Sequence, residues 1–351
     1  MTPTLLVIAT IARSSIMRTT SLALVSLLAL VSLLALGLGL SAMPTDSSAS
    51  ATQLRTSKLQ RGTKQATAAL TPFYKLGPAS SFVRGCFAPC LCPVQFSPEL
   101  RGSFEVHLLP SLNPAFDIYE VSGVNWLVGS GTGETRITGS GIYLIGSGGQ
   151  QLTLNLTLND GTPTVFDSGL VAGGTGGFHP RIDISINTNG LVCLDTLIQI
   201  KAAPQRESTL RSFAIDSGSV QEGCLPPCLC PIYQAQPVSG TFRLMPLGQG
   251  PAGLFEFAVV DLQWAIHPAA PSPLPAFTPV SGQGIYQIAL LSASPIMQHR
   301  MRLDLDVGGE SDQWDSGTVD DIGPFPVIDI ALGINDFMCY EKIFAIQASP
   351  Y

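Results

Sequence analysis

The chain has 351 residues, of which 45% are hydrophobic and only 12% are charged, and it carries 35 glycines and 27 prolines. Charged residues make up roughly 25% of an average soluble domain, so this composition disfavours helix-rich proteins and favours many strands joined by turns. The net charge is −7 and no Lys/Arg-rich run follows the N-terminal region. Nucleic-acid binding is therefore not expected, because it needs cations that replace phosphate counterions.

A long apolar run lies near the start of the chain. Residues 21–40 read SLALVSLLALVSLLALGLGL, with Arg18 before them and Ser41-Ala42 after them. This order predicts a signal peptide over 1–42, cleaved after Ala42, with Met17 as an alternative true start. The run is longer than the usual 7–15 residues, so an uncleaved membrane anchor is the rival interpretation. A membrane partner is expected only in that second case.

Residues 43–81 are predicted to be a disordered linker. They are rich in Ser, Thr, Ala and Gln, a composition that cannot bury enough apolar surface to fold. Their basic residues outnumber the single acid, Asp46, so a tail that adheres to a surface is the alternative to a solvated spacer.

The chain then repeats itself. Cys86-Phe87-Ala88-Pro89-Cys90-Leu91-Cys92-Pro93 recurs as Cys224-Leu225-Pro226-Pro227-Cys228-Leu229-Cys230-Pro231, 138 residues later. Later matches follow in the same order: Trp126 with Trp264, Asp167-Ser168-Gly169 with Asp315-Ser316-Gly317, and Cys193 with Cys339. The period has the length of a domain, which is too long for a solenoid repeat. We predict a tandem duplication with domains at 82–204 and 220–351, joined by a connector at 205–219.

Within each unit, apolar and polar residues alternate. Leu152, Leu154 and Leu156 are separated by Thr153 and Asn155, which is typical of a strand with one buried face. In the first unit we predict strands at 94–97, 102–110, 116–128, 135–145, 150–159, 163–171, 180–188 and 191–202. The predicted fold class is all-β, with two tandem antiparallel β-sandwich or small β-barrel domains. Trp126 and Trp264 lie in apolar strands and are expected in the cores.

Each unit has four cysteines, which predicts disulfides in an exported chain. The two sets are Cys86, Cys90, Cys92 and Cys193, and Cys224, Cys228, Cys230 and Cys339. Spacing alone allows three pairings per set. Loop closure favours Cys86–Cys90 with Cys92–Cys193, and Cys224–Cys228 with Cys230–Cys339, because a link between the first and last strands closes about 100 residues. A four-thiolate metal site or a redox pair is the alternative, disfavoured by the uneven spacing and the oxidising compartment.

The Asp-Ser-Gly triplets suggest one catalytic alternative. Aspartic proteases carry such a triplet in each of two lobes, where two carboxylates share a proton. Asp167 and Asp315 occupy equivalent places here, but a third triplet begins at Asp216, and little chain follows each matched Asp in its unit. A turn or bulge is the simpler interpretation. Asp304 and Asp306 resemble part of a calcium loop, but their alternation with apolar residues favours the wet face of a strand.

Two function classes remain. The first is a secreted or extracytoplasmic (periplasmic or cell-surface) non-catalytic protein with a structural, adhesive or ligand-binding role. Two copies would give it avidity for an extracellular-matrix or cell-surface ligand. The second is a hydrolase using Asp167 and Asp315, or a cysteine-ligated metal or redox protein. No cofactor, metal or catalytic residue is assigned.

Overall fold

The computed structural model describes residues 69–91, 95–110, 115–130, 133–159, 161–225, 227–250, 253–269, 277–290, 297–320 and 325–351. The predicted signal peptide and linker residues 43–68 lie outside this range. The described residues fall in a single compact unit, 64–351, which contains two antiparallel sheets. The all-β prediction is confirmed. Over the same ranges, no helix is both long and apolar enough to cross a bilayer.

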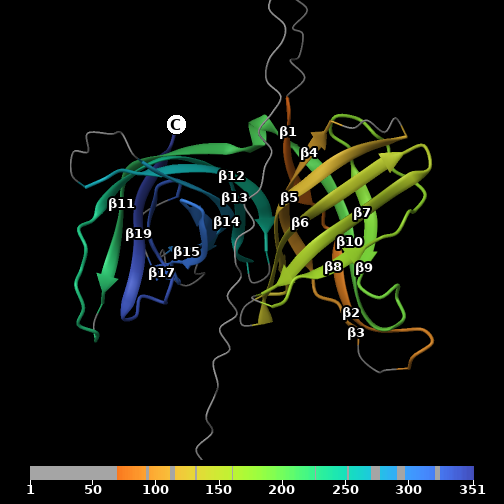
Figure 1. Ribbon diagram of the computed structural model, residues 1–351, viewed down its shortest axis with the longest axis horizontal. Coiled ribbons are helices and arrows are strands. Elements are labelled where there is room, and N and C mark those ends of the chain that lie inside the picture. Colours follow the sequence, from red (N-terminus) through yellow and green to blue (C-terminus); the bar gives the residue numbers. More distant parts are fainter. Residues whose placement is uncertain are drawn as a thin grey trace, which may run out of the picture. The chain divides into compact units, whose positions relative to one another are not determined.

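The first sheet (orange to green in Figure 1) has ten strands. They are β1 (Leu70–Leu76), β2 (Ser81–Phe87), β3 (Gln95–Phe96), β4 (Leu100–Leu109), β5 (Phe116–Val128), β6 (Thr135–Gly146), β7 (Gly149–Leu158), β8 (Thr164–Asp167), β9 (Ile182–Asn187) and β10 (Cys193–Arg206). The order is β1-β4-β5-β6-β7-β8-β9-β10, and β10 also pairs with β1, which closes the ring. Strands β2 and β3 continue from β10 beyond the ring.

The second sheet (teal to blue in Figure 1) closes in the same order. Its strands are β11 (Arg211–Cys224), β12 (Gln236–Gln249), β13 (Phe255–Ile266), β14 (Thr278–Leu290), β15 (Met297–Val307), β16 (Glu310–Asp315), β17 (Val319–Asp320), β18 (Ile328–Gly333) and β19 (Tyr340–Pro350). The ring β11-β12-β13-β14-β15-β16-β18-β19 returns to β11 and forms an eight-stranded antiparallel barrel. This closure answers the question of sandwich or barrel that the sequence left open. The duplication itself stays a prediction.

The interior of each ring follows from the alternation in the sequence. Leu152, Leu154 and Leu156 are buried in the first sheet, as are Met301, Leu303 and Leu305 in the second. Trp126 and Trp264 are also buried, and each packs edge to face on a phenylalanine of the neighbouring strand.

A glycine on the neighbouring strand pairs with each core tryptophan, Gly102 with Trp126 and Gly240 with Trp264. A Cβ atom on Gly240 would lie 2.2 Å from the carbonyl oxygen of Gln263 and 2.7 Å from Cα of Trp264. Only glycine fits there, because the tryptophan strand lies too close for any side chain.

Two sequence boundaries need correction. Strand β1 lies inside the predicted linker 43–81, so that segment is ordered from Leu70 onward. The predicted connector 205–219 is mostly strand, because β10 runs to Arg206 and β11 begins at Arg211. Both segments lack clean alternation, and their strand pairing comes from partners that are distant in the sequence.

Ion pairs with buried arginines join residues of the two sheets. Arg101 on β4 forms an ion pair with Glu256 on β13. It also pairs with Glu134, where the distance from Nη2 of Arg101 to Oε2 of Glu134 is 2.8 Å. Arg136 on β6 pairs with Asp304 on β15 at 2.6 Å. Burying these charges is tolerable only because each has a partner of opposite sign.

Candidate ligand-binding site at the mouth of the second barrel

A cavity of about 370 Å³ opens at one end of the second barrel. Its lining residues come from the ends of β11, β13 and β15, from the starts of β12, β14, β16 and β19, and from the segment between β11 and β12. It is therefore the mouth of the barrel at that end. Barrel mouths are common ligand sites, because strands distant in the sequence converge there around an apolar interior.

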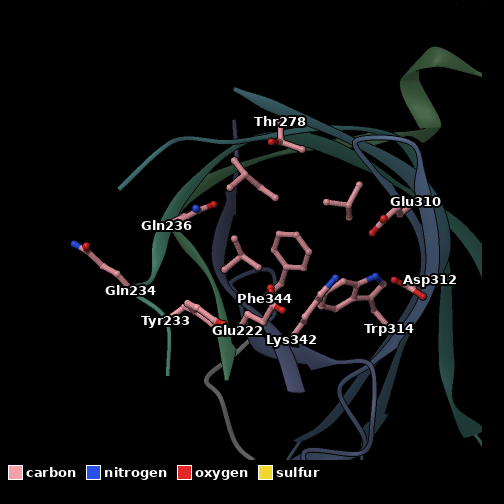
Figure 2. Close-up of a pocket in the computed structure, with 13 residues that line it drawn as sticks. Glu222, Tyr233, Gln234, Gln236, Thr278, Glu310, Asp312, Trp314, Lys342 and Phe344 are labelled. Atoms are coloured by element: carbon pink, nitrogen blue, oxygen red, sulfur yellow. The ribbon is translucent and has the colours of Figure 1, made fainter. Parts of the chain in front are cut away.

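The floor of the cavity is apolar and aromatic. Trp314 on β16 and Phe344 on β19 are buried and pack edge to face, with ring centroids 4.7 Å apart. Figure 2 shows both rings inside the circle of strands. Val220, Ile266 and Val307 complete the floor. Such a surface gains free energy by covering the apolar part of a ligand.

Charged residues surround this floor as a collar, which we define as Glu222, Glu310, Asp312 and Lys342. Their position follows from the alternation of side chains along a strand, in which every second residue points to the same face. Glu310 and Asp312 lie on the same face of β16 as Trp314, and Lys342 on the same face of β19 as Phe344. Among the described ion pairs none involves a collar residue. With three carboxylates and one ammonium, the collar favours a cation.

The segment after β11 forms one wall of the mouth. Tyr233 lines the cavity, and its backbone N–H donates to the carbonyl oxygen of Glu222 at 2.8 Å. The Gln221 side chain donates to the carbonyl oxygen of Tyr233 at 3.1 Å. Disulfides Cys224–Cys230 and Cys228–Cys339 fix the same segment. The cysteine cluster therefore builds part of the candidate site.

The predicted disulfide pairing is wrong, although disulfides do form in both units. The structure has Cys90–Cys193, Cys224–Cys230 and Cys228–Cys339. Cys86 is also disulfide-bonded, and Cys92 lies outside the described residues. The middle cysteine of each cluster, rather than the last, bonds to the remote one. Disulfides of this number indicate an oxidising, extracytoplasmic environment.

A turn explains the observed pairing. The backbone N–H of Cys90 donates to the carbonyl oxygen of Phe87, and that of Cys228 to Leu225, both at 3.1 Å. Each turn folds the middle cysteine back toward the start of the last strand, where Cys193 or Cys339 lies. The Cα atoms are then 4.8 Å and 4.9 Å apart, within bonding range. Loop length could not reveal this local geometry.

Two buried carboxylates organise the loops that precede the last strands. Asp195 accepts hydrogen bonds from the backbone N–H groups of Thr188, Asn189, Leu191 and Thr196. Glu341 does the same for Ile334, Asn335, Phe337 and Lys342. These bonds hold Cys193 and Cys339 in place, and in the second unit they also fix the backbone beside the collar residue Lys342.

The Asp-Ser-Gly triplets form turns with the same hydrogen bonds in both sheets. The Ser168 and Ser316 hydroxyls accept from the backbone N–H of Leu152 and Met301, each at 2.9 Å. Gly169 and Gly317 follow with φ of 60° and 63°, a region open to glycine. The third triplet, at Asp216, coincides with a register shift in β11. The turn-or-bulge interpretation explains all three.

The two aspartates of the catalytic alternative bind different partners. Asp167 accepts from Gln151 and Thr153 in the first sheet, whereas Asp315 forms an ion pair with Arg300 in the second. Burial acts to raise the pKa of Asp167, but the hydrogen bonds from Gln151 and Thr153 outweigh it and lower the pKa. In an aspartic-protease pair the two carboxylates lie against each other and share one proton, whereas the contacts of Asp167 and Asp315 lie in separate sheets.

The residues considered for metal binding have other partners. Asp304 pairs with Arg136, and Asp306 accepts from the backbone N–H of Gly309 at 2.8 Å. Within the described part of the chain, no three His, Cys, Asp or Glu side chains are grouped to hold a metal ion.

Sequence reasoning missed the mouth of the second barrel. Its signal in the sequence is a charged residue followed two positions later by an aromatic one, as in Asp312-Gln313-Trp314 and Lys342-Ile343-Phe344. The equivalent positions in the first unit hold Thr164, Phe166, Thr196 and Ile198, so the charged collar belongs to the second unit. Comparisons with protein-family models, curated proteins and solved structures find no match to this chain.

Proposed function

We propose that this chain is an exported, non-catalytic binding protein, and that the mouth of its second barrel takes a small amphiphile with a cationic group. The observation that carries this proposal is the cavity of about 370 Å³, with an aromatic floor and a collar of three carboxylates to one ammonium. Export is supported by the disulfides and by the N-terminal sequence pattern.

Each part of the cavity matches one part of such a ligand. The apolar body would cover Trp314 and Phe344, and the cationic group would lie among Glu222, Glu310 and Asp312. Most of the free energy would come from burial of apolar surface, while the collar would select the charge. The disulfide-tied wall keeps the mouth in shape, which lowers the entropy cost of binding.

Isothermal titration calorimetry on the full chain tests the proposal with three probes of similar size: 1-naphthylmethylamine, 1-naphthylmethanol and 1-naphthoate. We expect the amine to bind most tightly and the carboxylate most weakly. Glu310→Gln should weaken the amine selectively. Val220→Phe, which copies the equivalent Phe82 of the first unit, should fill the cavity and weaken the amine and the alcohol at least about tenfold.

Val165→Phe is the matched control, because it makes the same change at an exposed position of β8 in the first sheet and should leave binding unaltered. Equal affinity for all three probes, or binding that survives Val220→Phe, would show that the mouth is not the site.

A further inference from the structure

Each unit exposes a cluster of large apolar side chains next to its cysteine loop. We define the first tip as Leu91, Phe96, Val192 and Leu194, and the second tip as Leu229, Ile232, Tyr233, Met338 and Tyr340. Leu91 and Leu229 are 102% and 101% exposed, and the other tip residues between 47% and 66%. Leaving so many apolar groups in water is unfavourable, and exposed patches of this kind mark interaction sites.

The tips occupy equivalent positions and keep their apolar character with different residues. Leu91 matches Leu229 within the repeated cysteine cluster, Val192 matches Met338, and Leu194 matches Tyr340. In both units a disulfide joins the two loops of the tip, Cys90–Cys193 in the first and Cys228–Cys339 in the second. The apolar side chains are therefore held outward on a cross-linked frame.

The tips are also free of charge over long segments. Residues 85–98 and 223–242 contain no Asp, Glu, Lys, Arg or His, and the opposing loops 187–194 and 334–340 contain only Asp336. Protein interfaces surround their apolar centre with a polar rim and a complementary shape. The uncharged segments of the tips need no such match at the boundary of a lipid bilayer, which accepts apolar side chains and tyrosine without a matching pocket.

We infer that the two tips dock on a lipid surface, with Leu91 and Leu229 inserting among the acyl chains near the headgroups. Two tips on one chain give avidity, since the second inserts at high effective concentration once the first has bound. Because the tips carry no basic cluster, zwitterionic lipid is sufficient and binding does not depend on salt. This inference does not rest on the cavity proposal.

The test places a fluorescent reporter on each tip of the full chain. Leu91→Trp and Leu229→Trp are mixed with phosphatidylcholine vesicles with and without brominated acyl chains. We expect a blue shift and quenching by the brominated lipid for both. Trp126, Trp264 and Trp314 are buried and supply a constant background that the unaltered chain measures. The N-terminal apolar run is the same in every sample.

Leu170→Trp is the matched control. Leu170 is also an exposed leucine, and its neighbour Val171 pairs with Gln150, near the turn from β6 to β7 at the other end of the sheet. It should show neither effect. A second measurement uses Leu91→Ser and Leu229→Ser, each of which should reduce quenching of a reporter on the remaining tip about tenfold at limiting lipid.

Four outcomes would overturn the inference. The first is the absence of quenching at both tips, and the second is equal quenching at Leu170→Trp. The third is self-association in sedimentation velocity without vesicles that Leu229→Ser abolishes, since it would show that the tip meets a second copy of the chain. Loss of vesicle binding at high salt would equally contradict an uncharged docking mode.

Discussion

Removing the long-range disulfide of the second barrel should cost far more stability than removing its short-range neighbour. Cys228–Cys339 spans 111 residues, whereas Cys224–Cys230 spans 6. Both lie in the same cysteine cluster, so the comparison keeps the local surroundings similar. The perturbation is the double variant Cys228→Ala/Cys339→Ala, set against Cys224→Ala/Cys230→Ala.

The chain-entropy model gives the magnitude. A cross-link restricts the unfolded chain by an amount that grows with the logarithm of the loop length, so the long link contributes about 4.8 kcal/mol and the short one about 2.3 kcal/mol. The long-link variant should therefore lose roughly 2.5 kcal/mol more of the free energy of unfolding than the short-link variant.

Guanidinium unfolding under non-oxidising, non-reducing conditions measures this difference. A Trp126→Phe background leaves Trp264 and Trp314, both in the second barrel, so tryptophan emission reports that barrel alone. The comparison holds if the free energy of unfolding depends on the guanidinium concentration with the same slope in both variants. Equal losses, or a larger loss for the short link, would refute the view that the cross-link stabilises by restricting the unfolded chain.

Three further predictions concern the interior and the loops. Glu341→Gln removes the charge that accepts four backbone N–H groups, and should lower the free energy of unfolding by about 3 kcal/mol in urea titration. Burial would raise the pKa of Asp195, but hydrogen bonds from Thr188 and Leu191 lower it from 3.8. Its contribution to stability is therefore present above about pH 4 and lost as pH falls toward the folded pKa, which denaturation midpoints at about pH 6 and about pH 3 will show. Gly240→Ala should lower the melting temperature sharply through contact with the Trp264 strand, whereas Gly133→Ala, with no atom within 4 Å of the added Cβ, should not.

The features of the fold that the sequence predicts are those that leave a pattern among neighbouring residues. The predicted strands at 116–128 and 135–145 agree with β5 and β6 within one residue, because alternation is a property of neighbouring positions. Closure of the ring could not be predicted, because the pairing of β10 with β1 joins residues about 130 positions apart and produces no pattern among neighbouring residues. Strand β1 itself, with Phe73 and Tyr74 side by side, lacks the period of two along its full length.

The candidate site was harder still to predict. Trp314, Phe344 and Val220 lie on three strands, and only the direction of each side chain relative to the barrel interior brings them together. The described cysteines are disulfide-bonded, but their partners depended on turns such as that at Phe87–Cys90. Composition and spacing predict the elements, while the pairing of distant elements decides where their side chains meet.

Neighbouring strands of the second barrel are not joined by equal numbers of backbone pairs. Strands β16 and β18 share the single pair Asp315–Gly333, whereas β15 and β16 share six pairs, as do β18 and β19. Parting β16 from β18 breaks much less of the backbone ladder than parting any of these neighbours. Trp314 lies directly beside this seam. Backbone hydrogen bonding therefore opposes separation of neighbouring strands least at the point where the barrel wall borders its aromatic floor.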